Sequence, residues 1–165
     1  MDYLNKFKAD IDIVGKLLPS SQVTILSRDI QQNDWFPESL FWGKGVYTFY
    51  DLSGDPNKTS GDLEKYRATD KRKAVPGLNQ SQNDAMYVGS ATTGVKSSLK
   101  TRLSNHIFGT DNTSTGALHF NEWFYNDYKI LVQLYDKSVT TRQIRLLEAW
   151  RWDLLKPMFG QQPKL

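Results

Sequence analysis

The apolar positions of the chain change their spacing from helical to strand-like along its length. Near the N-terminus they recur every three or four residues, which predicts an amphipathic helix over residues 2–18 that ends before Pro19. The apolar residues of this pattern are Leu4, Phe7, Ile11, Val14 and Leu18. QVTILS, residues 22–27, has the composition of a short strand. We expect residues 1–44 to form a helical N-terminal extension.

Three later segments are rich in the β-branched and aromatic residues that sheets favour. They are GVYTFYDL, AMYVGS and YKILVQLYD, at residues 45–52, 85–90 and 128–136. Helical patterns follow at residues 94–108 and 138–155, and the second begins with a Ser/Thr capping signal. This order predicts an α+β domain over residues 45–165, in which helices flank a small three-stranded antiparallel sheet.

A polar insertion separates the first two of these strands. Residues 53–84 are dominated by Gly, Pro, Asn, Asp, Ser and Lys, which predicts a long loop. Loops of this length in compact domains are usually functional or mobile. A solvated, disordered loop is the alternative that the same composition supports.

Composition restricts the classes of function. A chain of 165 residues corresponds to one domain, and the absence of cysteine excludes disulfides and zinc fingers. No apolar run is long enough for a bilayer, and the N-terminus lacks the apolar core of a signal peptide, so we expect a cytoplasmic protein without a membrane partner. A net charge of +3 gives only weak support to a general polyanion-coating role.

Basic residues gather on both sides of the strand expected at residues 85–90. Residues 85–110 contain no Asp or Glu, and KYRATDKRK, residues 65–73, holds five basic residues and one Asp. The basic residues of the first stretch are Lys96, Lys100, Arg102 and His106. A solvated face and a charged loop explain this pattern as well as a nucleic-acid contact does.

Arg102 and His106 lie one helical turn apart, beside the apolar stripe of the helix predicted over residues 94–108. We therefore expect both side chains at the border of the core. The planar guanidinium of an arginine held there suits the oxygens of a phosphate. A surface salt bridge for Arg102 and a hydrogen-bonded boundary position for His106 are the plainer alternatives.

Glu148 interrupts the apolar line of the last predicted helix and should point inward. A buried carboxylate needs a partner. Arg145 or Arg151, three residues away on either side, would form an ordinary helix-surface ion pair. A hard divalent cation is the other partner that a single inward glutamate suits.

Five features, in this chain order, resemble the GIY-YIG nuclease superfamily. They are GVY at residues 45–47, YVG at residues 87–89, Arg102, His106 and Glu148. The resemblance spans residues 45–160 and implies the GIY-YIG fold, hydrolysis of phosphodiester bonds and a Mg²⁺ or Mn²⁺ cofactor. YVGSA is similar to the homing-endonuclease branch, and FPESLFWGKGVYTFY followed by a long insertion is similar to the restriction-enzyme branch.

The resemblance also implies roles for the site residues. Tyr47 would take the proton from the attacking water, and Tyr87 and His106 would position or tune it. Arg102 would hold the scissile phosphate, and Glu148 would carry the metal beside the departing 3′ oxygen. Ordinary strand packing is the alternative reading for the two tyrosines.

We therefore expect a stand-alone, metal-dependent endonuclease of the restriction or mobile-element kind that cuts double-stranded DNA, and a dimer is compatible with this function. Basic residues on both sides of the strand would contact DNA phosphates. These residues are Lys71, Arg72, Lys73, Lys96 and Lys100. A non-catalytic nucleic-acid-binding relative and a repair nuclease that depends on a partner are the alternatives.

The chain departs from the family pattern at two places. Tyr47 and Tyr87 are 40 positions apart, whereas the family usually joins these strands by a tight hairpin. Gly160 stands where the family normally has an asparagine that supports the active site. Gln161 and Asn105 are the candidates to replace that asparagine.

Overall fold

The computed structural model describes most of the chain. The described residues are 10, 12–30, 35–40, 43–69, 75–79, 81, 83–94, 98–109 and 116–163. Residues 1–9 of the predicted N-terminal helix lie outside them, and residues 12–15 are helical as expected.

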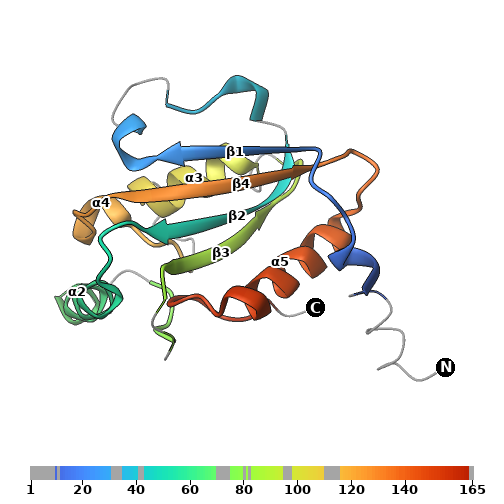
Figure 1. Cartoon of the computed structure of the whole chain (residues 1–165). Helices are drawn as coiled ribbons and strands as arrows, with labels where there is room; N and C mark the ends of the chain where they lie inside the picture. Colours follow the sequence, from blue (N-terminus) through green and yellow to red (C-terminus); the bar gives the residue numbers. More distant parts are fainter. Residues whose placement is uncertain are drawn as a thin grey trace.

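A four-stranded antiparallel sheet forms the centre of the molecule, in the order β1–β4–β2–β3 (Figure 1). Its strands are β1 (Ser21–Leu26), β2 (Lys44–Asp51), β3 (Ala85–Ala91) and β4 (Tyr128–Tyr135). The three strands predicted after residue 44 are confirmed, each within one residue of its expected start and end.

The expectation of a three-stranded sheet is wrong, because β1 adds a fourth strand at the edge beside β4. Ser21 lies opposite Leu134 and Leu26 opposite Lys129, so the pairing runs the whole length of β1. Val23 and Ile25 extend the apolar face that β4 already presents, and burial of Ile25 stabilises this pairing. Residues 21–26 of the predicted N-terminal extension therefore belong to the sheet.

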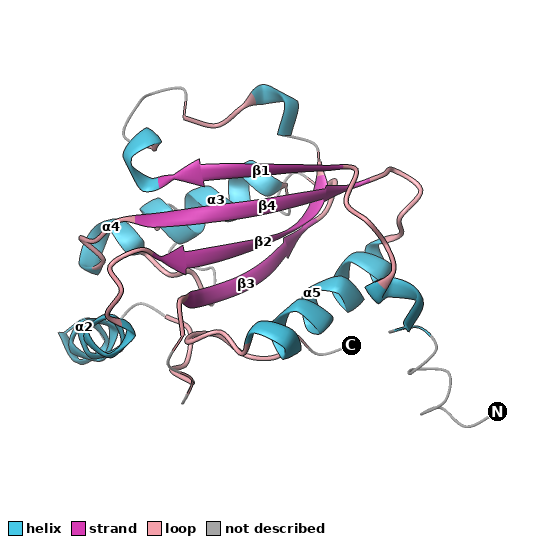
Figure 2. Cartoon of the chain, in the orientation of Figure 1, coloured by secondary structure: helices cyan, strands magenta, loops and turns pink. Residues whose placement is uncertain are grey.

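The α-helices lie around the sheet, as Figure 2 shows. They are α2 (Pro56–Thr69), α3 (Leu99–Phe108), α4 (Phe120–Trp123) and α5 (Thr141–Leu155), and short 3₁₀ turns occupy Ser27–Asp29 and Glu38–Leu40. The two helices predicted after residue 90 are confirmed as α3 and α5, but α3 begins at Leu99, after its cap Ser98, and not at residue 94 as expected. Thr140 and Gln143 form a capping box at the start of α5, as the Ser/Thr signal indicated. None of the described helices is long and apolar enough to cross a membrane.

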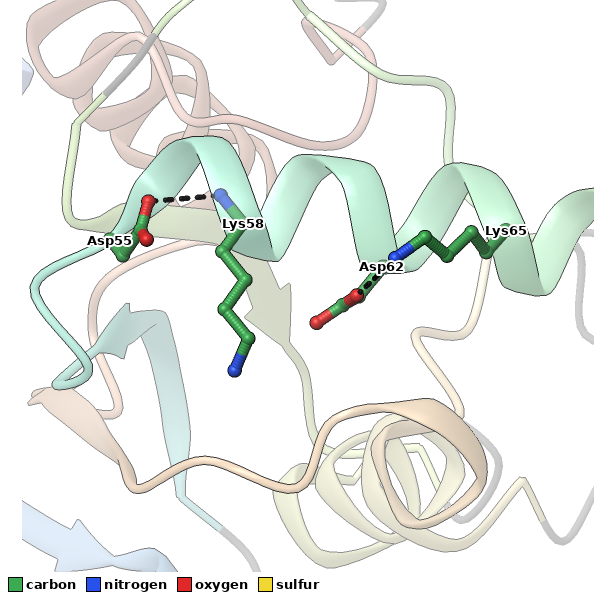
Figure 3. A network of polar contacts seen from close by, with 4 residues as sticks. All are labelled: Asp55, Lys58, Asp62 and Lys65. Atoms are coloured by element: carbon green, nitrogen blue, oxygen red, sulfur yellow. Dashed lines mark hydrogen bonds and ion pairs between the residues drawn. The ribbon is translucent and has the colours of Figure 1, made fainter.

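The loop predicted over residues 53–84 contains helix α2, so that prediction is wrong for 14 residues. The carboxylate of Asp55 accepts a hydrogen bond from the backbone N–H of Lys58 at 3.0 Å and caps the helix, and Pro56 takes its first position (Figure 3). Leu63 is completely buried, whereas the ion pair of Lys65 with Asp62, at 3.3 Å, lies on the surface. A narrow apolar stripe and a strong cap thus outweigh the polar composition.

The alternation of side chains along the strands creates two cores. Tyr47 and Phe49 of β2 face the side of the sheet that α3, α4 and α2 cover, whereas Val46 of β2 and Val88 of β3 face α5. β3 is an edge strand, and the chain that follows α5 pairs with its beginning through Met158 N–H to Ala85 C=O, at 2.9 Å. β3 thus has helices on both of its faces, and its free edge pairs with the C-terminal segment, residues 156–163.

Candidate active site

Tyr47 and His106 form a buried hydrogen bond between β2 and α3. The phenol oxygen lies 3.0 Å from Nε2, and the two residues are 1% and 5% exposed. On the other side of the ring, the backbone N–H of Leu118 donates to Nδ1 at 3.3 Å. Since Nδ1 accepts a hydrogen bond, a neutral His106 carries its proton on Nε2 and donates it to the oxygen of Tyr47.

Burial keeps both partners of this hydrogen bond uncharged. Burial, followed by the charges of Arg102 and His119, lowers the pKa of His106 to about 3, so that the imidazole is neutral near pH 7. Burial also raises the pKa of Tyr47 well above its usual value, and Tyr87 raises it further. His106 is therefore a hydrogen-bond donor at this position, and not a base that could accept the phenol proton.

The expected position at the border of the core is wrong for His106. Arg102 is exposed, whereas His106 lies inside the core, because Tyr47, Phe49 and Tyr87 pack around its ring. The buried face of α3 is thus wider than its leucine stripe.

Tyr87 joins the cluster from β3. Its ring centroid lies 4.6 Å from that of His106, and the residue is half-buried, so it is less covered than Tyr47. Burial and then the charge of Glu148 raise the pKa of Tyr87 to about 12. Two residues further along β3, a Cβ on Gly89 would lie 2.5 Å from the phenol oxygen of Tyr47, so only glycine lets that side chain lie across the strand.

Glu148 approaches the same strand from the opposite face. The hydroxyl of Ser90 donates to its carboxylate at 2.6 Å, and Ser90 faces α5 while Tyr87 faces α3. Burial raises the pKa of Glu148, and the Ser90 hydrogen bond and then the charge of Arg102 oppose this shift. The inward orientation predicted for Glu148 agrees with its half-buried position.

Electrostatic coupling links all five predicted site residues. The charge of Arg102 lowers the pKa values of Tyr47, Tyr87 and His106, and the charge of Glu148 raises those of the two tyrosines. Because β3 lies at the edge of the sheet, groups from both of its faces can act on one another around it. The fold thus brings Tyr47, Tyr87 and His106 into contact and places Arg102 and Glu148 near enough for their charges to act on this cluster.

The ion pair considered for Glu148 is not its main contact. Arg151 instead donates to the side-chain oxygen of Gln133 at 2.6 Å, and Arg145 is the weakest of the influences on the pKa of Glu148. Of the basic residues expected to contact DNA, Lys100 is exposed on α3. Lys71, Arg72, Lys73 and Lys96 lie outside the described residues.

An asparagine does reach the segment around Gly160, but it comes from the insertion. The side-chain NH₂ of Asn79 donates to the carbonyls of Pro157, at 2.9 Å, and Gly160, at 3.0 Å. Gly160 has φ +96°, and a Cβ there would lie 3.0 Å from the ring of Tyr87. Asn79 therefore fixes the backbone against which Tyr87 rests.

Glu148 is the candidate ligand for a divalent cation. Glu148 offers a half-buried anionic oxygen, which suits a hard ion such as Mg²⁺ or Mn²⁺. Within the described ranges, no group of three or more His, Cys, Asp or Glu side chains could hold a metal ion. Glu148 thus fits an ion that keeps several waters, as Mg²⁺ usually does.

Sequence reasoning missed three groups that hold this site. Ser90 could have been found, because strand alternation after Tyr87 and Gly89 turns it towards α5. Asn79 and the Leu118 N–H leave no such signal, since their contacts span 81 and 12 residues of the chain.

Comparisons with known protein families, with curated proteins and with solved structures find no match to this chain.

Proposed function

We propose that the protein is a metal-dependent endonuclease of the GIY-YIG type that hydrolyses phosphodiester bonds of double-stranded DNA. The observation that carries the proposal is the buried hydrogen bond between Tyr47 and His106, beside Tyr87 and under the charges of Arg102 and Glu148. Two neighbouring tyrosines, the guanidinium of Arg102 and the carboxylate of Glu148 are the kinds of group that this reaction uses. The ordered motifs of the sequence support the same assignment.

Each residue has a role that its surroundings allow. The exposed guanidinium of Arg102 is accessible to a phosphate and would stabilise the charge that develops on it. Tyr47 is 1% exposed and accepts a hydrogen bond from His106, so we assign it to positioning. Tyr87, the more accessible phenol, replaces Tyr47 as the proposed proton acceptor. Because its pKa is about 12, it must first release its own proton to solvent, and the positive charges of Arg102 and of a bound cation would favour that loss. The phenolate would then take a proton from the attacking water.

Glu148 would hold the divalent cation with its other carboxylate oxygen, Oε1, since Ser90 donates to Oε2. The cation, when bound, supplies positive charge beside the departing 3′ oxygen and lowers the pKa of nearby water. Ser90 orients the carboxylate, because its hydroxyl donates to one oxygen only.

The first prediction tests this function by cleavage of plasmid DNA in Mg²⁺ and, separately, in Mn²⁺. Wild-type protein should cut, and Glu148→Gln should keep its fold and DNA binding but lose cleavage by at least about 10²-fold, since the amide is a poor ligand for a hard cation. Glu64→Gln, an exposed residue of α2, is the matched control and should cut normally.

Cleavage by Glu148→Gln at the wild-type rate would contradict the proposed role of this residue. Wild-type protein that binds duplex DNA without cutting it would instead favour a non-catalytic relative or a partner-dependent nuclease. Cleavage that is restored only by a cell extract would identify the second of these.

A further inference from the structure

A pocket of about 350 Å³ opens beside Tyr87, where the insertion meets the segment that follows α5. Three glycines line it together with Val75, Pro76, Tyr87 and Gln161. Tyr87 thus belongs both to this pocket and to the cluster around His106. A molecule in the pocket would touch the residue that we propose as proton acceptor.

The described lining has a definite chemical character. None of its side chains is charged, and the glycines leave backbone groups and flat space where side chains would stand. Tyr87 offers an aromatic ring, and Gln161 offers an amide that can both donate and accept hydrogen bonds. The volume lies near the lower end of the range for ligand pockets, roughly 300–1,000 Å³, so the pocket suits a small, flat, uncharged group with polar edges.

We propose that this pocket binds one unpaired nucleobase of the cleaved strand, next to the scissile phosphate. The base stacks on the ring of Tyr87, and the amide of Gln161 meets its polar edge. The proposal rests on the proposed function, because the neighbouring phosphate would then lie beside Arg102. A base inside the duplex is stacked and paired, so its pairing edge is out of reach. A base that is turned out of the duplex exposes this edge to the protein.

One wall of the pocket is held in place before any ligand arrives. The N–H of Gly160 donates to the carbonyl of Gly77 at 2.9 Å, and Asn79 holds the carbonyl of Gly160. Both glycines line the pocket. A preformed wall lowers the ordering cost of binding, which suits a ligand that makes few contacts.

Gly77→Leu tests the pocket without disturbing its frame. A Cβ at Gly77 meets nothing within 4 Å, so the new side chain can occupy the pocket. Gly61→Leu on α2 also meets no atom within 4 Å and is the matched control. Gln161→Ala, at an exposed position near the C-terminus, removes the amide and serves if Gly77→Leu does not fold.

The first measurement does not depend on cleavage. The four deoxynucleoside 5′-monophosphates are titrated into each protein, and binding is followed by the NMR shift of the Gly77 or Gly160 amide. We expect binding by wild-type protein and by Gly61→Leu, and at least a tenfold weaker affinity in Gly77→Leu. No shift with any nucleotide, or equal affinity in all variants, would overturn the proposal.

The second measurement separates a base of the bound strand from a free nucleotide. The fluorescent base 2-aminopurine is placed at successive positions around the cut in duplex DNA, which is mixed with Glu148→Gln protein. One position should brighten severalfold, and Gly77→Leu or Gln161→Ala should abolish or weaken that change. Mononucleotide binding without any brightening position would overturn the proposal in favour of a free nucleotide.

The two proposals fail in different ways. If wild-type protein does not cut DNA but brightens one position through the pocket, the proposed function fails and the pocket remains. If it cuts DNA and Gly77→Leu changes neither binding nor brightening, the pocket proposal fails and the function remains.

Discussion

At the scale of single residues, His106 is neutral because of groups from several parts of the fold. Tyr47 of β2 and Tyr87 of β3 enclose its ring, and the nearby Arg102 and His119 disfavour a second positive charge. The Leu118 N–H fixes which ring nitrogen carries the proton. This arrangement links the geometry of the candidate site to the stability of the whole domain.

The second prediction follows from that link. The pKa of His106 is about 3 in the folded protein and 6.5 in an unfolded chain, so between these values the unfolded state binds more protons. Acidification below pH 6.5 should therefore lower the free energy of unfolding, by up to about 1.4 kcal/mol per pH unit. Above pH 6.5 His106 is neutral in both states, so it should cause no loss of stability there. Urea unfolding between pH 4 and 8 measures the slope. His106→Gln should have a shallower slope, and equal slopes would contradict the prediction.

The third prediction separates two roles of Arg102. If its guanidinium stabilises the phosphate during reaction, Arg102→Ala should slow the cleavage of bound DNA by about 10²–10³-fold and weaken DNA binding far less. Single-turnover cleavage and fluorescence anisotropy measure these two quantities. Lys100→Ala, two positions earlier on the same helix, is the control for the loss of one positive charge. Equal losses of rate and affinity would identify Arg102 as a simple electrostatic contact.

At the scale of secondary structure, elements with a strong periodic pattern could be predicted and α2 could not. Strands β2, β3 and β4 and helices α3 and α5 carry regular apolar positions, and their burial follows that pattern. Helix α2 buries little more than Thr59 and Leu63, so its composition resembles a loop. The signal that identifies it is local: Asp55 followed by Pro56 is a typical helix start.

The candidate site was predictable where its residues belong to such elements. Tyr47, Tyr87, His106 and Glu148 lie on predicted strands and helices, and strand alternation places the two tyrosines on the face that α3 covers and Ser90, the partner of Glu148, on the face that α5 covers. Contacts between irregular segments leave no periodic trace, and the link between Asn79 and Gly160 is of this kind. Sequence patterns therefore indicate the groups that we propose to react better than the groups that hold them in place.

The fourth prediction concerns that link between the insertion and the C-terminal segment. Asn79→Ala removes two hydrogen bonds, which should lower the free energy of unfolding by about 1–3 kcal/mol. It should also loosen Gly160 against Tyr87 and slow cleavage by up to about 10²-fold. Urea unfolding and plasmid cleavage measure the two effects.

Asn83 provides the control for this prediction. Its side chain donates to the carbonyls of Leu155 and Lys156, both at 2.9 Å. These carbonyls lie at the end of α5, whereas Asn79 binds those of Pro157 and Gly160. Asn83→Ala also removes the hydrogen bond that the side-chain oxygen accepts from the N–H of Ala85 at 2.8 Å, so it should destabilise the protein at least as much and affect cleavage less. If both variants lose stability and cleavage in proportion, Asn79 has only a structural role.

At the scale of the whole molecule, the sheet includes part of the chain that was expected to lie outside it. β1 joins through its pairing with β4, although only Ile25 among its residues is buried. The composition of residues 22–27 predicted this strand within one residue of its observed bounds, but not its place in the sheet, because composition does not show which neighbouring strand a strand will pair with. Any DNA contact of the N-terminal region would thus be tied to the same rigid sheet as the candidate site.

The fifth prediction concerns the charge of the molecule. The net charge is only +3, so affinity for DNA must come from local groups of basic residues, and Lys71, Arg72 and Lys73 form the densest one in the sequence. Replacing these three with serine should weaken binding to all duplexes and reduce the slope of log affinity against log salt by up to about three units, roughly 0.9 per phosphate contact. Cleavage of bound DNA should continue, because none of the three matches a site residue.

A control variant makes the same change at Lys16, Lys129 and Lys137, which also brings the net charge from +3 to zero. Anisotropy titrations at several salt concentrations should show a smaller effect for the control. Identical curves for the two variants would mean that net charge alone governs binding, and would leave the insertion without a specific role in DNA recognition.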